Sequence, residues 1–476
     1  MSDAQVVVVG GGIAGLAAAA FLSGAAGGPV RARVTLLEAS ERVGGKLWGG
    51  EVGGVRVDLG AESMLARRPE AVELARAVGL AEQLEPPTTA KASIWTRGAL
   101  RPLPGGQVMG VPGDLDALAA SGVLTAEGLE RARHEGATEV GDDVAIGRYV
   151  ADRLGQEVVD RLVEPLLGGV YAGRADEISL RAAVPQLLSI ARGGGSLVEG
   201  VHELASRPKV VGTPVFQGLH GGLGTLPEAV AAACVKAGVD LRTNAPVDEL
   251  RRTPEGWRVV TGGEVLHADA VVLAAPAPAA ARLLRADAPT TAAELDTVEY
   301  AGMALVTLAF RRADLAEVPV GSGFLVPPVD GRRIKASTFS SNKWGWLERS
   351  APDAFLLRTS LGRYREEEAL ELPDEELVAR SLADLGEAIG LTARPYDTAV
   401  SRFRAGLPQY PVGHLDRVAR VRAAAARVGG LALCGAAYDG VGIPACIGSA
   451  AAAVAALDKL LAPATGEGST ERTMGA

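Results

Sequence analysis

Three glycines near the start of the chain, Gly10, Gly12 and Gly15, have the G-x-G-x-x-G spacing of a dinucleotide-binding turn. The first glycine of such a turn permits a sharp bend, the second lets backbone amides approach a pyrophosphate, and the third lets a helix pack on the preceding strand. Glu38 follows the next apolar run, where its carboxylate can accept hydrogen bonds from a ribose diol. These residues predict a dinucleotide site but do not distinguish nicotinamide from flavin.

A second group of small and charged residues narrows the choice of dinucleotide. Residues 42–46 read R-V-G-G-K, so a glycine pair lies beside cations that can offset phosphate charge. Residues 57–65 read as a strand that runs into a turn, and residues 441–443 precede an apolar helix expected to start at about Cys446. Amides at that helix end can hold the pyrimidine edge of a flavin, and the helix dipole stabilises the anionic reduced ring. The set favours a flavin.

Together these motifs resemble the amine-oxidase-like flavoprotein superfamily, from the first predicted strand to the last predicted helix. Three further stretches, residues 94–104, 168–179 and 407–418, resemble signatures of the protoporphyrinogen and coproporphyrinogen III oxidases of that superfamily. Its arginine-rich composition and expected lack of a membrane segment make the chain most similar to the soluble Gram-positive coproporphyrinogen III oxidases. It departs from the pattern at Phe403, where relatives often have tryptophan, and at Ala445, where they often have aspartate.

The resemblance implies an oxygen-dependent FAD oxidoreductase that acts on CH–CH groups. Its reaction would be the six-electron oxidation of coproporphyrinogen III to coproporphyrin III in haem biosynthesis, with release of hydrogen peroxide. A meso methylene between two pyrroles can lose hydride to the flavin N5, so no catalytic side chain is expected. Protoporphyrinogen IX is an alternative substrate. Amine or carotenoid oxidation, or a non-catalytic porphyrin-binding flavoprotein, are further alternatives.

The resemblance also assigns cofactor residues, which lie in the glycine turns, at strand ends and at the start of the last helix. They are Gly10, Gly11, Gly12, Ile13, Ala14, Gly15, Glu38, Ala39, Arg42, Gly45, Lys46, Gly60, Ala61, Glu62, Ser63, Val247, Phe403, Gly435, Val441, Gly442 and Ile443. No metal ligands are expected.

The expected substrate residues are an arginine for a propionate and residues that line a flat apolar slot. They are Arg97, Gly169, Val170, Tyr171, Ser322, Phe324 and Leu325. Residues 168–173 are expected to form a glycine-rich turn that passes close to the macrocycle, with the orientation of Tyr171 left open. Four basic residues are expected in solvated turns: Arg332, Arg333, Lys335 and Lys343.

Positioning these residues requires an α/β fold, with a Rossmann-type FAD-binding domain, an inserted helical domain and a mixed-sheet substrate domain. Hydrophobic periodicity and the places of the motifs divide the chain accordingly. The divisions are residues 1–80, 215–280 and 425–462 for a discontinuous FAD-binding domain, 105–205 for the helical domain, 81–104 and 285–420 for the substrate-binding domain, and 463–476 for a disordered tail.

Composition excludes several other classes of protein. The chain has 476 residues, 48% of them hydrophobic, and a formal net charge of −9, which argues against nucleic acid as a partner. Its 3 cysteines, Cys234, Cys434 and Cys446, form no C-x-x-C pair, as is typical of reduced thiols in the cytosol. No transmembrane segment is expected. We predict a cytoplasmic enzyme whose partners are a porphyrinogen and oxygen, with transient contact to ferrochelatase-type haem enzymes.

Overall fold

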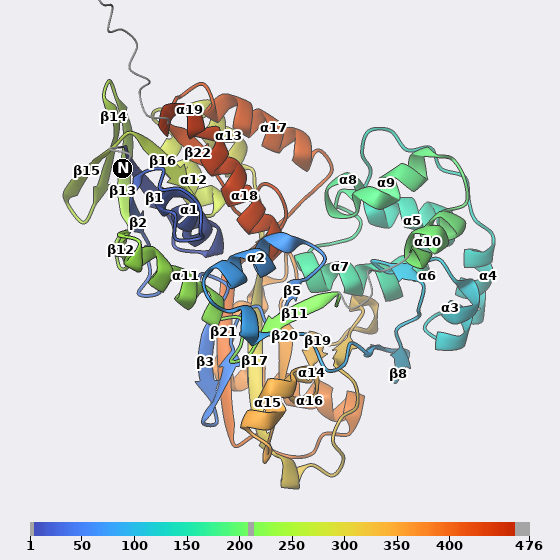
Figure 1. Cartoon of the computed structure of the whole chain (residues 1–476). Helices are drawn as coiled ribbons and strands as arrows, with labels where there is room; N and C mark the ends of the chain where they lie inside the picture. Colours follow the sequence, from blue (N-terminus) through green and yellow to red (C-terminus); the bar gives the residue numbers. More distant parts are fainter. Residues whose placement is uncertain (1–3, 208–213, 462–476) are drawn as a thin grey trace, which may run out of the picture.

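The computed structural model describes residues 4–207 and 214–461 (Figure 1). The expected disordered tail, 463–476, lies outside the described residues. In Figure 1 the blue N-terminal strands lie beside the red C-terminal helices, the teal helices project to one side, and a large sheet lies below both. Segments from the two ends of the sequence therefore build one part of the molecule together.

A five-stranded parallel sheet carries the dinucleotide turn. Its order is β12-β2-β1-β16-β22. The bounds are Gln5–Val9 for β1, Arg33–Leu37 for β2, Asp240–Arg242 for β12, Ala270–Leu273 for β16 and Leu431–Leu433 for β22. Val6–Val9 are buried, as expected of a parallel strand covered on both faces. Because β2 and β16 flank β1 on opposite sides, the carboxyl end of β1 is a topological switch point, where open α/β sheets bind ligands.

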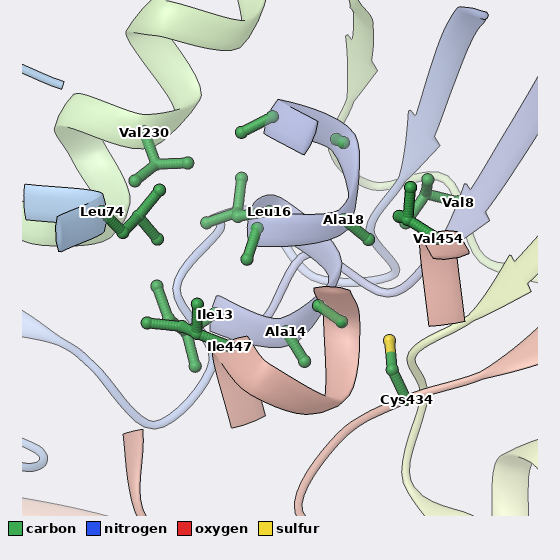
Figure 2. Close-up of a cluster of buried hydrophobic side chains, with 14 of the residues drawn as sticks. Val8, Ile13, Ala14, Leu16, Ala18, Leu74, Val230, Cys434, Ile447 and Val454 are labelled. Atoms are coloured by element: carbon green, nitrogen blue, oxygen red, sulfur yellow. The ribbon is translucent and has the colours of Figure 1, made fainter. Parts of the chain in front are cut away.

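Helices cover both faces of this sheet. One face packs against α1 (Ile13–Ser23), α2 (Pro69–Ala77), α11 (Thr225–Lys236) and α18 (Ile443–Ala456). Figure 2 shows Leu16 and Ala18 of α1 in this layer, with Val230 and Ile447 from neighbouring helices. The other face packs against a small antiparallel sheet and three helices. These are β13 (Val247–Thr253), β14 (Gly256–Thr261), β15 (Glu264–Ala268), α12 (Ala277–Leu284), α13 (Pro289–Asp296) and α17 (His414–Ala425).

A seven-stranded mixed sheet has the order β21-β17-β20-β19-β18-β7-β8. The bounds are Asp397–Pro408 for β21, Tyr300–Arg311 for β17, Ala354–Leu361 for β20, Ile334–Thr338 for β19, Gly323–Leu325 for β18, Ala92–Thr96 for β7 and Ala99–Pro102 for β8. Helix α16 (Asp374–Ile389) packs on one face. The hairpin of β3 (Gly49–Val52) and β4 (Val55–Asp58), which follows the glycine loop, packs on the other face with α14 (Ser340–Lys343) and α15 (Gly345–Ser350) nearby.

Short helices form a third cluster around their own hydrophobic core. They are α3 (Leu115–Ser121), α4 (Ala126–Arg133), α5 (Ile146–Leu154), α6 (Gln156–Val158), α7 (Glu164–Tyr171), α8 (Leu180–Ala183), α9 (Pro185–Arg192) and α10 (Leu197–Ser206). A π-helical turn, Val159–Val163, joins α6 to α7. Two short sheets, β9 (Gln107–Val108) with β10 (Val111–Pro112), and β5 (Met64–Leu65) with β11 (Phe216–Leu219) and β6 (Leu84–Glu85), complete the connections.

The expected α/β fold class is confirmed, while the domain boundaries stay predictions. Two local predictions are wrong. Helix α18 begins at Ile443, with Pro444 in its first turn, rather than near Cys446. Gly168 and Gly169 lie inside α7 rather than in a turn, and the helix ends at Tyr171, followed by the C-cap residue Ala172, whose φ is 50°. Burial of Leu167 and Tyr171 in the helical core keeps this glycine-containing segment helical.

Candidate cofactor and substrate site

The turn between β1 and α1 has the shape of a phosphate cradle. Gly10 has a φ of 106°, and a Cβ there would lie 2.9 Å from the carbonyl oxygen of Ala274. A Cβ at Gly15 would lie 1.8 Å from the carbonyl oxygen of Gly10, so close packing requires both glycines. A Cβ at Gly12 would meet no atom within 4 Å. Open space therefore lies at the N-terminus of α1, where backbone amides and the helix dipole favour a phosphate.

Glu38 borders this turn. Its Oε2 accepts a 2.6 Å hydrogen bond from the backbone N–H of Gly11. Its Oε1 accepts hydrogen bonds from the backbone N–H and the hydroxyl of Ser40, at 2.8 and 2.7 Å. These bonds hold the carboxylate at the carboxyl edge of the sheet, with Ala39 exposed beside it. A ribose diol next to the turn could donate to this carboxylate.

The second glycine loop packs directly on the first. The backbone N–H of Gly44 donates a 2.8 Å hydrogen bond to the carbonyl of Gly11. The guanidinium of Arg42 donates to the carbonyl of Gly45 at 2.9 Å and lies 4.5 Å from the ring centre of Trp48. Arg42 therefore holds the shape of the loop through contacts with the loop's own residues.

The start of α18 lies close to both loops. Gly442 is the N-cap of α18, flanked by Val441 and Ile443. Gly435, which precedes this helix, lies beside α1, since a Cβ there would be 4.0 Å from the Cβ of Ala14. Among the described residues Lys46 forms no salt bridge, and burial lowers its pKa. Cys446 of α18 is the ionisable neighbour that acts on Lys46. An unpaired cation and a helix N-terminus thus face the same region, which fits an anionic group.

The segment Gly60–Ser63, here called the cofactor segment, packs against the second glycine loop. The backbone N–H of Ala61 donates a 3.0 Å hydrogen bond to the carbonyl of Lys46. A Cβ at Gly60 would lie 2.1 Å from the same carbonyl oxygen, so only glycine allows this approach. The carboxylate of Glu62 is buried and pairs with Lys343 and Arg358 of the mixed-sheet region. Burial raises the pKa of Glu62, but Arg358 and Lys343 outweigh it and lower the pKa to about 2.

One face of the mixed sheet carries a row of small and apolar residues, here called the slot row. Register pairs Leu325 with Ala336, Ala336 with Ser360, and Ser360 with Leu305, across four strands. All four side chains are partly exposed, although the residues that alternate with them are buried. The slot row carries no titratable side chain, so it offers a flat, neutral surface.

Helix α7 faces this row. A Cβ at Gly169 would lie 3.7 Å from the Cδ2 of Leu325, and a Cβ at Gly168 would meet nothing within 4 Å. Val170 next to them is 42% exposed. The structure therefore brings Gly169, Val170 and Leu325 together beside open space. Sequence reasoning missed Gly168 and the other three members of the slot row, which period-2 alternation in the strand patterns could have indicated.

Two expected substrate residues are core residues instead. Phe324 is 2% exposed and packs edge-on against Trp95 and Phe339, with ring centres 6.0 Å apart in both pairs. Strand alternation puts Phe324 and Leu325 on opposite faces of the sheet, so the prediction for Phe324 is wrong. The ring of Tyr171 packs 5.6 Å from that of Tyr410, and burial raises its pKa to about 12. Tyr171 therefore faces the helical core.

Arg97 and Ser322 both donate hydrogen bonds to backbone carbonyls. Arg97 is exposed with a φ of 52°, and its Nη1 donates to the carbonyls of Gly122 and Leu124 at 3.0 and 2.5 Å. Its other guanidinium nitrogens make no hydrogen bond to the described residues, so a role in binding a carboxylate stays a prediction. The hydroxyl of Ser322 donates to the carbonyl of Lys91 at 3.0 Å and so fixes a loop.

The remaining predicted cofactor residues lie at strand positions. Val247 begins β13, and its carbonyl accepts a 2.9 Å hydrogen bond from Arg282. Phe403 of β21 is paired with Met303 of β17, and both side chains are partly exposed on the face that carries the slot row. Their contacts with a cofactor stay predictions.

The expectation of four solvated basic residues is wrong for two of them. Lys343 is mostly buried in its pair with Glu62, with 17% of its side chain exposed. Lys335 is buried at the bulge of β19, and its Nζ donates a 2.8 Å hydrogen bond to the carbonyl of Gly362. Burial, aided by the nearby Arg363, lowers the pKa of Lys335 to about 7. Arg333 is exposed as expected.

Taken together, the residues fit a flavin dinucleotide. The open space at Gly12 and the Glu38 carboxylate suit the diphosphate and a ribose, and the start of α18 offers amide donors near an unpaired cation. The slot row and α7 suit a flat apolar molecule. The described residues contain no cluster of side chains suited to a metal ion. Within the same residues, no helix has the length and apolar character needed to cross a membrane.

Comparison with known proteins places the chain among flavoproteins. Residues 13–458 match the family described as flavin containing amine oxidoreductase. A coproporphyrinogen III oxidase of Mycobacterium tuberculosis is 39% identical over 97% of this chain and 99% of the relative. A coproporphyrinogen III oxidase of Bacillus subtilis is 32% identical over 95% of this chain and 98% of the relative.

A solved structure gives a similar result. The crystal structure of a candidate protoporphyrinogen oxidase from Exiguobacterium sp. 255-15 has a TM-score of 0.85 and 34% identity to this chain. The match covers 97% of this chain and 100% of that one. The architecture of the parallel sheet, the mixed sheet and the inserted helices is therefore shared over the whole length.

Proposed function

The chain belongs to the flavin-containing amine oxidoreductase family, and from that premise we propose that it is an FAD-dependent oxidase of coproporphyrinogen III. The observation that carries the proposal is the nearly full-length similarity to relatives of that name, at 39% identity for the mycobacterial protein. The neutral slot row opposite α7 supports it, because the pyrrole rings of a porphyrinogen are apolar and its charges lie only on the propionates at the rim.

The dinucleotide site supplies the redox chemistry in this proposal. When bound, the flavin accepts hydride from a meso carbon of the substrate. The turn at Gly12 and the N-terminus of α1 hold the diphosphate through backbone amides. Glu38 accepts hydrogen bonds from a ribose, and the amides at Gly442 and Ile443 donate to the pyrimidine edge. Each of these groups is already held by the fold, so little ordering is needed on binding.

The slot row orients the substrate and excludes water. None of its side chains titrates near neutral pH, so the slot row contributes position rather than acid–base catalysis. Arg97 binds a propionate with the guanidinium nitrogens that its backbone contacts leave available. We also propose that molecular oxygen would be the electron acceptor of the bound flavin, with hydrogen peroxide as the product. We further propose that the enzyme works in haem biosynthesis in the cytoplasm.

Comparing kcat/KM on two porphyrinogens tests the substrate. We expect the purified holoenzyme to have a higher kcat/KM for coproporphyrinogen III, which carries four carboxylates, than for protoporphyrinogen IX, which carries two. The similarity to the Exiguobacterium structure makes protoporphyrinogen IX the second candidate. A higher value for protoporphyrinogen IX would replace the proposed substrate, and no turnover of either would refute the proposal.

Filling the space beside α7 tests the slot. The Gly168→Leu variant places a side chain where a Cβ meets nothing within 4 Å, so it should block the macrocycle and raise KM strongly. The Gly168→Ala variant is the matched control, because alanine favours the helix by about 1 kcal/mol and adds only a methyl group. Equal KM values for the two variants would place the substrate elsewhere.

A further inference from the structure

A buried charge cluster joins the cofactor segment to the mixed sheet. Nζ of Lys343 lies 2.7 Å from Oε1 of Glu62 and 3.4 Å from the hydroxyl of Ser63. Nε of Arg358 lies 3.2 Å from Oε2 of Glu62, and its Nη1 donates a 2.6 Å hydrogen bond to the carbonyl of Gly60. Two cations from the mixed-sheet region therefore hold three residues of the cofactor segment at once.

The same cluster reaches the carboxyl end of β4. The carboxylate of Asp58 accepts 2.8 Å hydrogen bonds from the backbone N–H groups of Leu223 and Gly224, just before α11. Arg358 acts on Asp58 as well as on Glu62. A small cavity is lined by Asp58, Glu62 and Arg358. Burial raises the pKa of Asp58 to about 6, because Arg358 and the two backbone N–H groups offset only part of its desolvation, whereas Glu62 pairs with both cations.

A continuous path of contacts links this cluster to the dinucleotide turn. The cofactor segment donates from Ala61 to the carbonyl of Lys46, and Gly44 of the same loop donates to the carbonyl of Gly11. Backbone hydrogen bonds therefore run from the first glycine turn through the second loop to the cofactor segment. Lys343 and Arg358 form the last step, from that segment to the sheet that carries the slot row.

We propose that Lys343 and Arg358 are positioning residues that clamp the cofactor segment and so set the distance between the flavin and the slot row. The inference rests on the proposed function, because it takes Gly60–Ser63 to contact the flavin. Both cations act through Glu62 and the backbone rather than on the substrate. Without these contacts the protein still folds, but the cofactor segment can move, and the affinity for FAD therefore falls.

The test measures FAD affinity and apo-protein stability separately. Lys343→Met leaves Glu62 paired with Arg358 alone, and the double variant Glu62→Gln/Lys343→Met also removes the negative charge that Lys343 had offset. We expect Lys343→Met to raise the Kd of the apo-protein for FAD by about tenfold or more. The double variant should recover thermal stability without recovering FAD affinity, and Lys343→Arg should recover both.

Arg349→Met is the matched control. Arg349 lies in α15, next to the helix α14 that carries Lys343, and pairs with Glu85 rather than with the cofactor segment. The Kd of this variant for FAD should equal that of the wild type. Recovery of FAD affinity together with stability in the double variant, or an unchanged Kd in Lys343→Met, would overturn the clamp. If Lys343→Met raises the Kd for FAD but the wild-type enzyme oxidises no porphyrinogen, the clamp stands and only the proposed function is refuted.

Discussion

Alanine at Gly12 should separate cofactor binding from folding. Gly12 has a φ of −68°, which any residue can adopt, and a Cβ there meets no protein atom within 4 Å. The apo-protein should therefore tolerate Gly12→Ala, with a loss below about 1 kcal/mol from the weaker helix N-cap. The added methyl group nevertheless occupies the space next to the amides that hold the diphosphate.

The expected loss of FAD affinity follows from those amides. A hydrogen bond to a charged group contributes about 1.5–3 kcal/mol, so displacing the diphosphate from one amide should weaken binding by about 10-fold to 150-fold. Gly15→Ala is the contrasting variant, because its Cβ would lie 1.8 Å from the carbonyl oxygen of Gly10. That overlap should destabilise the apo-protein by about 1–3 kcal/mol or more.

Titration of apo-protein with FAD, followed by quenching of flavin fluorescence, gives the Kd, and circular dichroism gives the apo-protein Tm. We expect Gly12→Ala to have a near-normal Tm and a raised Kd for FAD, and Gly15→Ala to have a lowered Tm. A wild-type Kd for Gly12→Ala would refute the assignment of this turn to the diphosphate. If the Tm of Gly12→Ala is as low as that of Gly15→Ala, the claim that open space lies at the N-terminus of α1 is refuted.

Three further variants or reagents test other parts of the structure. Because burial lowers the folded-state pKa of Lys335 from 10.5 to about 7, protein stability falls as pH falls from about 10 through 7. Lys335→Met should therefore raise Tm more at pH 6 than at pH 10. An equal rise in Tm at both pH values would contradict the claim that Lys335 is charged and buried at pH 6. Arg97→Ala should raise KM for coproporphyrinogen III more than for an uncharged analogue, with an equal rise arguing against a propionate contact. Burial raises the pKa of Cys234 to about 12 and of Cys446 to about 11, so a thiol reagent should not modify either in the native protein; rapid labelling would contradict their burial.

The geometry of the dinucleotide turn could be predicted from the sequence because its signals are local. Gly10, Gly12 and Gly15 lie on one turn, and Glu38 ends the adjacent strand, so spacing along the chain reports spacing in the fold. Helix α18 begins at Ile443, earlier than the apolar pattern indicates, because Pro444 lies in its first turn, a position that proline favours.

The substrate half depends on contacts between distant segments. Which of Phe324 and Leu325 faces the slot is decided by the register of β18 in its sheet, and not by their residue types. The partner of Lys343, Glu62, lies 281 positions away, so a cation that looks solvated in sequence is buried in the fold. The glycines of α7 are typical of a turn, but packing against the helical core keeps the segment helical.

Anaerobic mixing of the oxidised holoenzyme with coproporphyrinogen III tests the central claim most directly. The account predicts that the visible absorbance of the bound flavin bleaches as porphyrin forms, and that admission of oxygen restores it with release of hydrogen peroxide. Flavin absorbance that stays unchanged in the presence of coproporphyrinogen III and of protoporphyrinogen IX would contradict the claim that this chain is a porphyrinogen oxidase.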